Sequence, residues 1–551
     1  MNEPVPRRRG VFGTIGAGIT ALRTFLANLL FVLLLVAILV ALLSSTDEVA
    51  TVPDGGALVL RLDGPILEAP PEPDPLAFLF RDEDAPRAVV LHELVAGLRA
   101  AAEDDRIAAL VLDVDEFPGA APATLRAIGD ALDEFAASGK PVYSGADFLG
   151  QSQYLLASHA THLYLHPQGQ VMLRGFASQP AYFASALDKL RVNVHVFRVG
   201  EYKSAVEPFL RDDMSDASRE AETALVQGLW TAYRDRIAGN RRLPPEALDA
   251  LLDDMPSRLR AVQGDFARLA LETGLVDELL TRDAYRARLV DLVGEEEDGS
   301  GFRGVALSRY LAMARMTGLT GSPEDAPKVG VVVAEGTITG GRDAGEVGEA
   351  TAALIRRARG DDDVAALVLR VNSPGGSAFF SEVVRKELEL AQLQGKPVVA
   401  SFGGVAASGG YWIAATADRI FAEPDTITGS IGIFGLLPTF EESAEALGIN
   451  SDGVGTHPLS GAGNVLEPLN PAFADLLQQS VERGYERFLD IVARGRGMTA
   501  EEVDAVAQGR VWLGRTALEL GLVDELGGVD AAAEAAAQAA GLVSWETDYL
   551  A

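Results

Sequence analysis

The stretch Ala365-Ala-Leu-Val-Leu-Arg-Val371, followed directly by Asn372-Ser-Pro-Gly-Gly376, decides the class of fold. The first part is short, apolar and rich in branched side chains, as expected of a buried strand. Val329–Ala334 before it and Pro397–Phe402 after it have the same character, and Phe380–Gln394 between them has helical apolar spacing. This order of strand, helix and strand predicts right-handed βαβ units around a mostly parallel sheet.

The same pattern occurs twice in the chain, about 250 residues apart. The matching segments keep one order and one offset, and they include Ala109–Leu112 with Ala366–Leu369, Gly139–Val142 with Gly395–Val398, and Gly274–Leu279 with the identical Gly521–Leu526. We therefore predict two homologous α/β halves, residues 47–316 and 317–551. Their joint is expected at Thr317–Lys328, a segment rich in Gly, Ser, Pro and charge.

Residues 1–46 have a different character. Thr24–Leu43 is a run of 20 residues in which only Thr24 and Asn28 are polar. A helix of this length spans ~30 Å, the thickness of a bilayer core. Arginines precede the run and acidic residues follow it, which predicts a cytoplasmic N-terminus. A cleaved signal peptide is the alternative, but its apolar region is usually shorter and ends at a small-x-small site. We expect an uncleaved transmembrane anchor.

Composition excludes some functions. The 551 residues are too many for one core. With 47 basic and 79 acidic residues the formal net charge is −32, so we expect no nucleic-acid partner. The chain has no cysteine, which excludes disulfides, thiol nucleophiles and cysteine-ligated metals.

A candidate nucleophile follows the predicted strand Pro397–Phe402. In Ala406-Ala-Ser-Gly-Gly-Tyr411, small neighbours leave the Ser408 hydroxyl accessible on a tight turn that opens a helix. The Gly409 N–H at this helix N-terminus, together with an N–H of Gly375–Gly376, could form an oxyanion hole. The alternative is that Ser408 only caps the helix, which is the commoner role of such a serine.

A serine nucleophile needs a base. The chain has six histidines, but no spacing among them supports a Ser/His/Asp triad. Lys203 stands at the mouth of the apolar strand Val194–Val199, where burial could lower its pKa from ~10.4. The alternative is a surface cation near Glu201 and Glu207. The residues alone leave these two interpretations even.

Four longer motifs resemble one known family. The chain looks like the long, duplicated form of the signal peptide peptidase A family, serine peptidase family S49. The resemblance covers most of the chain and rests on Val371–Ser377, Ala406–Trp412, Thr428–Phe434 and Phe197–Phe209.

The resemblance implies roles for individual residues. Ser408 falls on the family's nucleophile and Lys203 on its general base. Gly409 and Gly375–Gly376 fall on its oxyanion region, and Ser430 on a hydroxyl that orients the lysine. No metal or cofactor is implied.

The resemblance also implies a setting. The fold would consist of two tandem crotonase/Clp-protease-like domains behind the N-terminal transmembrane helix. The family forms a bowl-shaped homotetramer over the bilayer. This chain would be a single-pass protein of the bacterial inner membrane, with its catalytic part in the periplasm, and would degrade cleaved signal peptides.

The repeat tests the predicted pair of residues. The first-half position that matches Ser408 is Gln151, with Ser152 one place away. The second-half position that matches Lys203 falls in Gly455–Ser460, which has no lysine. Each half keeps one member, so the site is expected to form between halves, either within one chain or between chains.

Two other functions compete with a peptidase. A crotonase-like acyl-thioester enzyme would use the same glycines but would usually carry Glu or Asp in place of Ser408. A non-catalytic membrane scaffold could derive from a decayed protease. The predicted anchor argues against the former, and the complementary motifs in the two halves argue against the latter.

Overall fold

The computed structural model describes residues 20, 22–33, 35–36, 52–70, 88–296, 298–299, 301–317, 326–341 and 346–550. The chain separates into two units, Met1–Val52 and Pro53–Ala551. In the first unit residues 22–33 are helical. Within the described ranges, no helix combines the length and the apolar character needed to cross a membrane. The predicted anchor Thr24–Leu43 lies partly outside those ranges, as does most of the predicted joint Thr317–Lys328.

The first half of the larger unit is built on a parallel sheet in the order β8-β6-β5-β4-β1-β9. Its strands are β1 Gly56–Arg61, β4 Ile107–Asp113, β5 Val142–Leu149, β6 His162–Val171, β8 Glu278–Leu279 and β9 Gly304–Ala306. Its helices are α2 Leu91–Glu103, α3 Pro122–Ala137, α4 Gln151–Ala157, α5 Ala184–Lys189, α6 Asp216–Arg241, α7 Ala247–Asp253, α8 Met255–Ala261, α9 Phe266–Glu272, α10 Arg282–Val293 and α11 Leu307–Thr317. A short parallel pair joins β2 Ile66–Leu67 to β3 Val89–Val90.

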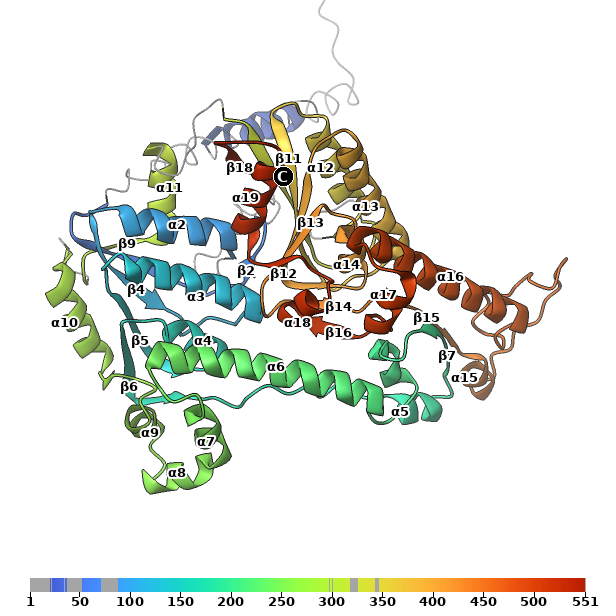
Figure 1. The fold of residues 1–551 in the computed structure, drawn as a ribbon, viewed down its shortest axis with the longest axis horizontal. Coiled ribbons are helices and arrows are strands. Elements are labelled where there is room, and N and C mark those ends of the chain that lie inside the picture. Colours follow the sequence, from blue (N-terminus) through green and yellow to red (C-terminus); the bar gives the residue numbers. More distant parts are fainter. Residues whose placement is uncertain are drawn as a thin grey trace, which may run out of the picture. The chain divides into compact units, whose positions relative to one another are not determined.

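The second half repeats this plan in the order β16-β14-β12-β11-β10-β18, and β13 pairs with β12 on one side and with β17 on the other. Its strands are β10 Lys328–Glu335, β11 Val364–Ser373, β12 Val398–Ala407, β13 Arg419–Ala422, β14 Ile427–Gly429, β16 Val511–Leu513, β17 Glu525–Leu526 and β18 Glu546–Leu550. Its helices are α12 Glu349–Arg359, α13 Ala378–Leu393, α14 Gly409–Ala414, α15 Glu441–Ala446, α16 Pro471–Arg496, α17 Ala500–Val506, α18 Gly514–Glu519 and α19 Val529–Ala539. Figure 1 shows both halves. The predicted parallel α/β plan is confirmed.

The central strand β11 is buried on both faces, as its sequence predicts. Leu367 and Leu369 pack into the cluster formed with α12 and α13, whereas Ala366 and Val368 pack against the alanines of α19. Successive side chains of the strand point to opposite faces, and each face packs into its own hydrophobic core. Both sets of side chains are therefore apolar, and the sequence of this part of the strand is continuously apolar.

The repeated segments make the same contacts in each half. The hydroxyl of Tyr154 donates to the Leu275 carbonyl at 2.8 Å, and that of Tyr411 donates to the Leu522 carbonyl at 2.7 Å. This contact ties α4 in the first half, and α14 in the second, to the loop that enters the next short strand. The two halves that the sequence repeat predicts therefore also share this contact in the structure.

The identical Gly-Leu-Val-Asp-Glu-Leu segments also have a structural reason. Asp277 accepts a hydrogen bond from the Leu163 N–H, and Asp524 accepts one from the Ile420 N–H, each at 2.7 Å. The carboxylate joins the segment to the start of a neighbouring strand. The boundary between halves at residues 316 and 317 stays a prediction.

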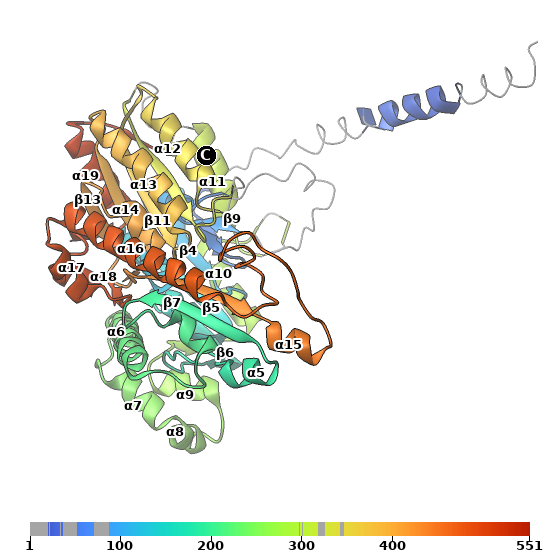
Figure 2. The same ribbon diagram turned by 90° about the vertical axis from the view of Figure 1, so that its right-hand side faces the viewer.

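One pair of strands crosses between the halves. β7, Asn193–Val199, extends from the first half and pairs antiparallel with β15, Ile433–Thr439, of the second. Figure 2 shows the two strands side by side, with α5 and α15 at one end. The predicted strand Val194–Val199 is confirmed, but it lies outside the parallel sheets. Its function is to carry the following residues into the second half.

Candidate active site

Ser408 lies on a sharp turn between β12 and α14. Its φ is +54°, a left-handed conformation that is unusual for a residue with a side chain. Its N–H donates to the Gly429 carbonyl at 2.9 Å. Ser408 occupies the N-cap position of α14, but its side chain makes no capping hydrogen bond. The Ser408 hydroxyl therefore does not cap the helix in this structure.

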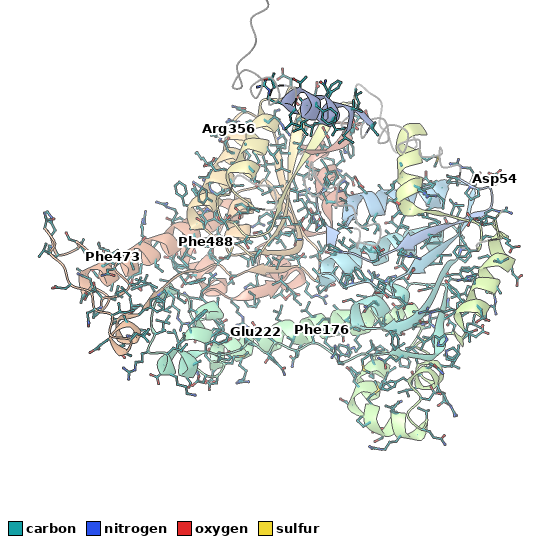
Figure 3. All side chains as sticks on the ribbon, turned by 180° about the vertical axis from the view of Figure 1, so that it is seen from behind. Asp54, Phe176, Glu222, Arg356, Phe473 and Phe488 are labelled. Carbon is teal, nitrogen blue, oxygen red and sulfur yellow. The ribbon has the colours of Figure 1, made fainter. Side chains whose placement is uncertain are left out.

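The turn is held by close packing beneath α14. A side chain at Gly410 would bring Cβ within 2.5 Å of the Ser373 carbonyl oxygen, so only glycine fits there. Trp412 lies on the same helix, and its ring centre is 4.6 Å from that of Phe488 on α16. Phe488 is labelled in Figure 3. The nucleophile candidate thus stands on a rigid support.

Lys203 comes from the first half and reaches Ser408 within one chain. Its Nζ lies 3.2 Å from the Ser408 Oγ, although the two residues are 205 positions apart. It donates to the carbonyl oxygen and to the hydroxyl of Ser430, both at 2.9 Å. Lys203 is only 4% exposed, so the surface-cation alternative is wrong.

Burial changes the chemistry of this amine. Removal from water disfavours the charged form and lowers the pKa of Lys203 to about 8. No carboxylate is among the causes of this shift, which is consistent with its hydrogen bonds going to neutral oxygens of Ser430.

The segment that follows α17 holds Lys203 in place, and the sequence did not reveal it. The Tyr202 N–H donates to the Gln508 carbonyl at 2.8 Å, and the Ser430 N–H donates to the Arg510 carbonyl at 2.7 Å. Gly509 has φ +78°, and a Cβ there would lie 2.7 Å from the Lys203 N. The only available signal was a glycine after a short helical pattern, which is too common to indicate a site.

Three predicted glycines meet beside Ser408. Gly375 has φ +101°, and a Cβ there would lie 2.6 Å from the Gly409 N and 2.8 Å from the Ser408 Cβ. The Gly376 N would lie 3.1 Å from a Cβ on Gly409. Ile338 fixes this loop, because its N–H donates to the Gly375 carbonyl and its own carbonyl accepts from Ser377.

The amides of this loop differ in availability. The Gly375 N–H donates to the Ser373 hydroxyl at 3.2 Å. The N–H groups of Gly376 and Gly409 donate to no other group in the part of the chain that the structure describes. Two unpaired donors therefore lie on the two segments that meet at Ser408.

The first half keeps the glycine turn at Gly119, but neither the positive φ of Ser408 nor its chemistry. Gly119, which matches Gly375, has φ +103°, and a Cβ there would lie 3.1 Å from the Ser152 Oγ. The carbonyl of Gln151 accepts from the buried Tyr233 hydroxyl at 2.9 Å. A cavity of about 90 Å³ lies here, lined by residues that include Ser152, His159 and Leu155. Lysine is absent from this lining.

Within the described residues, no group of three or more His, Asp or Glu side chains is placed to hold a metal ion.

The comparisons with known proteins agree with the geometry in pointing to a peptidase. Residues 134–295 and 391–543, one region in each half, match peptidase family S49.

Two curated relatives extend the match. Protease 4 of Salmonella typhi is 44% identical over 501 residues, which cover 90% of this chain and 80% of the relative. Protease 4 of Haemophilus influenzae is 41% identical over 492 residues, covering 88% and 79%.

Among solved structures, a mutant of ClpP1 from Listeria monocytogenes matches with a TM-score of 0.25 and 15% identity, covering 37% of this chain and 94% of that one. The crotonase-like alternative has no support in the family match. Since that match covers both halves and the relatives align along most of their length, the chain belongs to peptidase family S49.

Proposed function

We propose that this chain is a serine endopeptidase that degrades cleaved signal peptides, with Ser408 as nucleophile and Lys203 as general base. One observation carries the proposal. A buried lysine amine lies within hydrogen-bond distance of a serine hydroxyl on a strained turn, 3.2 Å apart. A serine at such a distance from a base whose pKa is lowered is the arrangement that nucleophilic catalysis requires.

The reaction is acyl transfer. Neutral Lys203 accepts the proton of the Ser408 hydroxyl while the Oγ attacks the peptide carbonyl. The protonated lysine then gives that proton to the departing amine, and water releases the acyl group from Ser408. Ser430 orients the amine through its hydroxyl and carbonyl, both 2.9 Å from Nζ.

The oxyanion that forms on the carbonyl needs fixed donors. The N–H groups of Gly376 and Gly409 are the best placed, since both are unpaired within the described residues and adjacent to Ser408. Gly409 also lies at the N-terminus of α14, where the helix dipole favours negative charge. Gly375 contributes by its conformation, which lets the loop approach Gly409, and its own N–H is already engaged.

The first test compares Ser408→Ala with Ser152→Ala, the serine beside the matching turn of the first half. With an apolar peptide as substrate, Ser408→Ala should lower turnover by at least about 10³-fold, whereas Ser152→Ala should retain it. A serine-directed acylating inhibitor should add its mass to the peptide that contains Ser408. Full turnover in folded Ser408→Ala would refute the assignment.

The proposed substrates are apolar peptides that remain in a membrane. We infer that Thr24–Leu43 anchors the chain in the bacterial inner membrane as a single pass, with a cytoplasmic N-terminus and a periplasmic catalytic part. Phe379 on the first turn of α13, three residues after Gly376, is 69% exposed and offers an apolar contact beside the proposed oxyanion loop. An extended peptide could bind along such a surface through its main chain.

We further propose that the chain acts as a homotetramer. β7 of the first half is covered by β15 of the second, but the corresponding segment after α15 exposes apolar side chains. Ile449 is 52% exposed and Leu459 is 43% exposed. A second copy would bury them by repeating the contact between halves. Light scattering should give four times the chain mass, and a monomer would refute this assembly.

A further inference from the structure

A buried ion pair links the first half to the central strand of the second. Glu68, just after β2, binds Arg370 of β11 through two hydrogen bonds, Nε to Oε2 at 3.0 Å and Nη2 to Oε1 at 2.9 Å. The two side chains are only 7% and 4% exposed. The remaining guanidinium nitrogen of Arg370 donates to the Ser401 hydroxyl at 2.9 Å and to the Phe402 carbonyl at 3.1 Å.

Stability alone does not explain this pair. Taking two charges out of water costs free energy that their attraction often fails to recover, so apolar residues of similar volume commonly serve as well. The other residues from Val364 to Val371 are apolar, and all except the half-buried Ala365 are buried. Arg370 is therefore an exception in a stretch, Val364–Val371, that would otherwise be purely hydrophobic, and its partner comes from the other half.

A second connection starts from the same residue. The backbone N–H of Glu68 donates to Glu335 Oε2 at 3.1 Å, and the other oxygen of Glu335 accepts from the Asn372 side-chain amide at 3.0 Å. The Asn372 oxygen accepts from the Val405 N–H at 3.2 Å. Glu68 is thereby joined to the ends of both β11 and β12.

Both strand ends lead directly into the proposed active site. Asn372 is followed by Ser373 and the loop that carries Gly375 and Gly376, while Val405 precedes Ser408 by three residues. The pairing of β11 with β12 shifts register between Val371 and Ser373, so the ladder alone does not hold this region.

The first half also fills the space around this irregular stretch. A Cβ on Gly403 would lie 2.9 Å from Glu68 Oε1, and a Cβ on Gly404 would lie 2.5 Å from the Ala121 Cβ of the first half. These close approaches need glycine in β12. The strand that carries Ser408 is therefore packed directly against residues of the other half.

The repeat provides an internal comparison. The side chain of Asp115, which matches Asn372, accepts from the Asp147 N–H at 3.0 Å, so this contact between a side chain and the neighbouring strand occurs in both halves. Asp113, which matches Arg370, pairs instead with Arg61 of the neighbouring strand, and these side chains are 35% and 66% exposed. Of these two matching positions, only the one in the half that carries the serine makes a buried link to the other half.

We propose that Glu68 is a positioning residue for the peptidase reaction: its carboxylate holds the Gly375–Gly376 loop and the Ser408 strand in register through Arg370, and its backbone N–H adds the contact with Glu335. This inference rests on the proposed function. The first half would then supply the base and also the alignment of the oxyanion donors with the nucleophile.

The test uses the full chain in detergent. Glu68→Gln removes the charge but keeps the shape, and Glu68→Leu/Arg370→Met replaces the whole pair by apolar side chains, which avoids leaving Arg370 unpaired. Arg99→Gln is the control, because Arg99 also pairs across the halves, with Asp530, but at an exposed position. Thermal unfolding, kcat, KM and the pH dependence of kcat/KM are measured for each.

We expect both Glu68 variants to lower kcat at least tenfold, with KM within about twofold of wild type and the pH midpoint unchanged, since the contacts of Lys203 are untouched. Arg99→Gln should match wild type. A double variant that unfolds at the wild-type temperature and keeps its kcat would overturn the inference, as would a shifted pH midpoint. Activity retained by Ser408→Ala would instead refute the proposed function.

Discussion

At the scale of single residues, the decisive property is the protonation state of one amine. Lysine is a base only when neutral, and in water its pKa is too high for that at pH 7. In this fold, burial alone lowers the pKa of Lys203 to about 8. Neutralising it at pH 7 then costs about 1.4 kcal/mol, because each pKa unit corresponds to 1.36 kcal/mol.

The first prediction concerns pH. In the proposed mechanism the reactive form of Lys203 is neutral and its pKa is about 8, so kcat/KM should rise with pH and level off above about 8. Below the midpoint the increase should approach about tenfold per pH unit. A pH–rate profile of the wild type measures this. Lys203→Arg should be inactive throughout, whereas Lys386→Arg, at an exposed position, should follow the wild-type curve. A flat profile from pH 6 to 9 would contradict the role of Lys203.

A second prediction concerns Ser430. Ser430→Ala removes one of the two oxygens that orient Lys203 but leaves the carbonyl contact at 2.9 Å. Lys203 becomes charged as it accepts the Ser408 proton, and a hydrogen bond to a charged group contributes about 1.5–3 kcal/mol, so kcat should fall roughly 10- to 100-fold.

KM should change little in Ser430→Ala, because Ser430 contacts Lys203, the proposed base. Ser443→Ala, outside the site, serves as the control in the same assay. Wild-type kcat in Ser430→Ala would mean that the carbonyl alone orients the amine.

At the scale of elements, the proposed site depends on how three parts of the chain meet. β12 and α14 present Ser408, the strand β7 delivers Lys203, and the segment at Gly509 closes over the lysine backbone. Arg510 strengthens this closure, since its guanidinium lies 4.8 Å from the Tyr202 ring centre and 4.5 Å from that of Trp512. The precise approach of the two catalytic candidates is therefore a property of packed elements.

Gly509→Ala tests this arrangement. A Cβ at this position would lie 2.7 Å from both the N and the Cβ of Lys203, so the lysine must shift although its own side chain is unchanged. We expect kcat to fall more than tenfold. Gly497→Ala is a matched control, because it also has positive φ, +65°, but no atom within 4 Å of its added Cβ.

Both glycine variants carry the strain of a left-handed residue, about 1–2 kcal/mol. Thermal unfolding should therefore show this loss of stability in both variants, with a larger loss in Gly509→Ala because its Cβ also meets Lys203, while only Gly509→Ala loses activity. Equal activity in the two variants would show that the position of Lys203 tolerates displacement.

At the scale of the whole molecule, the proposed site is divided between the two halves of the duplicated chain. Neither half carries both Ser408 and Lys203, and the two meet only because β7 crosses to pair with β15. The larger unit, Pro53–Ala551, contains every residue of the proposed site.

Removal of residues 1–46 should therefore leave a soluble and active peptidase. The deleted segment contributes no residue to the proposed site, so kcat/KM on a soluble peptide should stay within about twofold of the detergent-solubilised full chain. When cells are fractionated, the full chain should be found with the membranes and the truncated chain in the soluble fraction. A well-folded truncation without activity would mean that the N-terminal segment helps to form the site.

Much of this protein is determined by its sequence alone. The parallel α/β plan, the duplication, the turn at Ser408 and the strand before Lys203 all follow from patterns among residues close in sequence, because strand burial and helix period are local properties. The glycines at 375, 376 and 409 were found in the same way, since a tight turn leaves a signature within a few residues.

Only the tertiary structure decided which of these parts meet. From the residues alone Lys203 could equally have been a surface cation, and whether it reached a serine in its own chain or another was open. The packing of two halves brings it to Ser408 across 205 positions and buries it. The roles of Gly509 and Glu68 could not be predicted from the sequence for the same reason. Their roles arise from contacts between segments hundreds of residues apart, which no local pattern records.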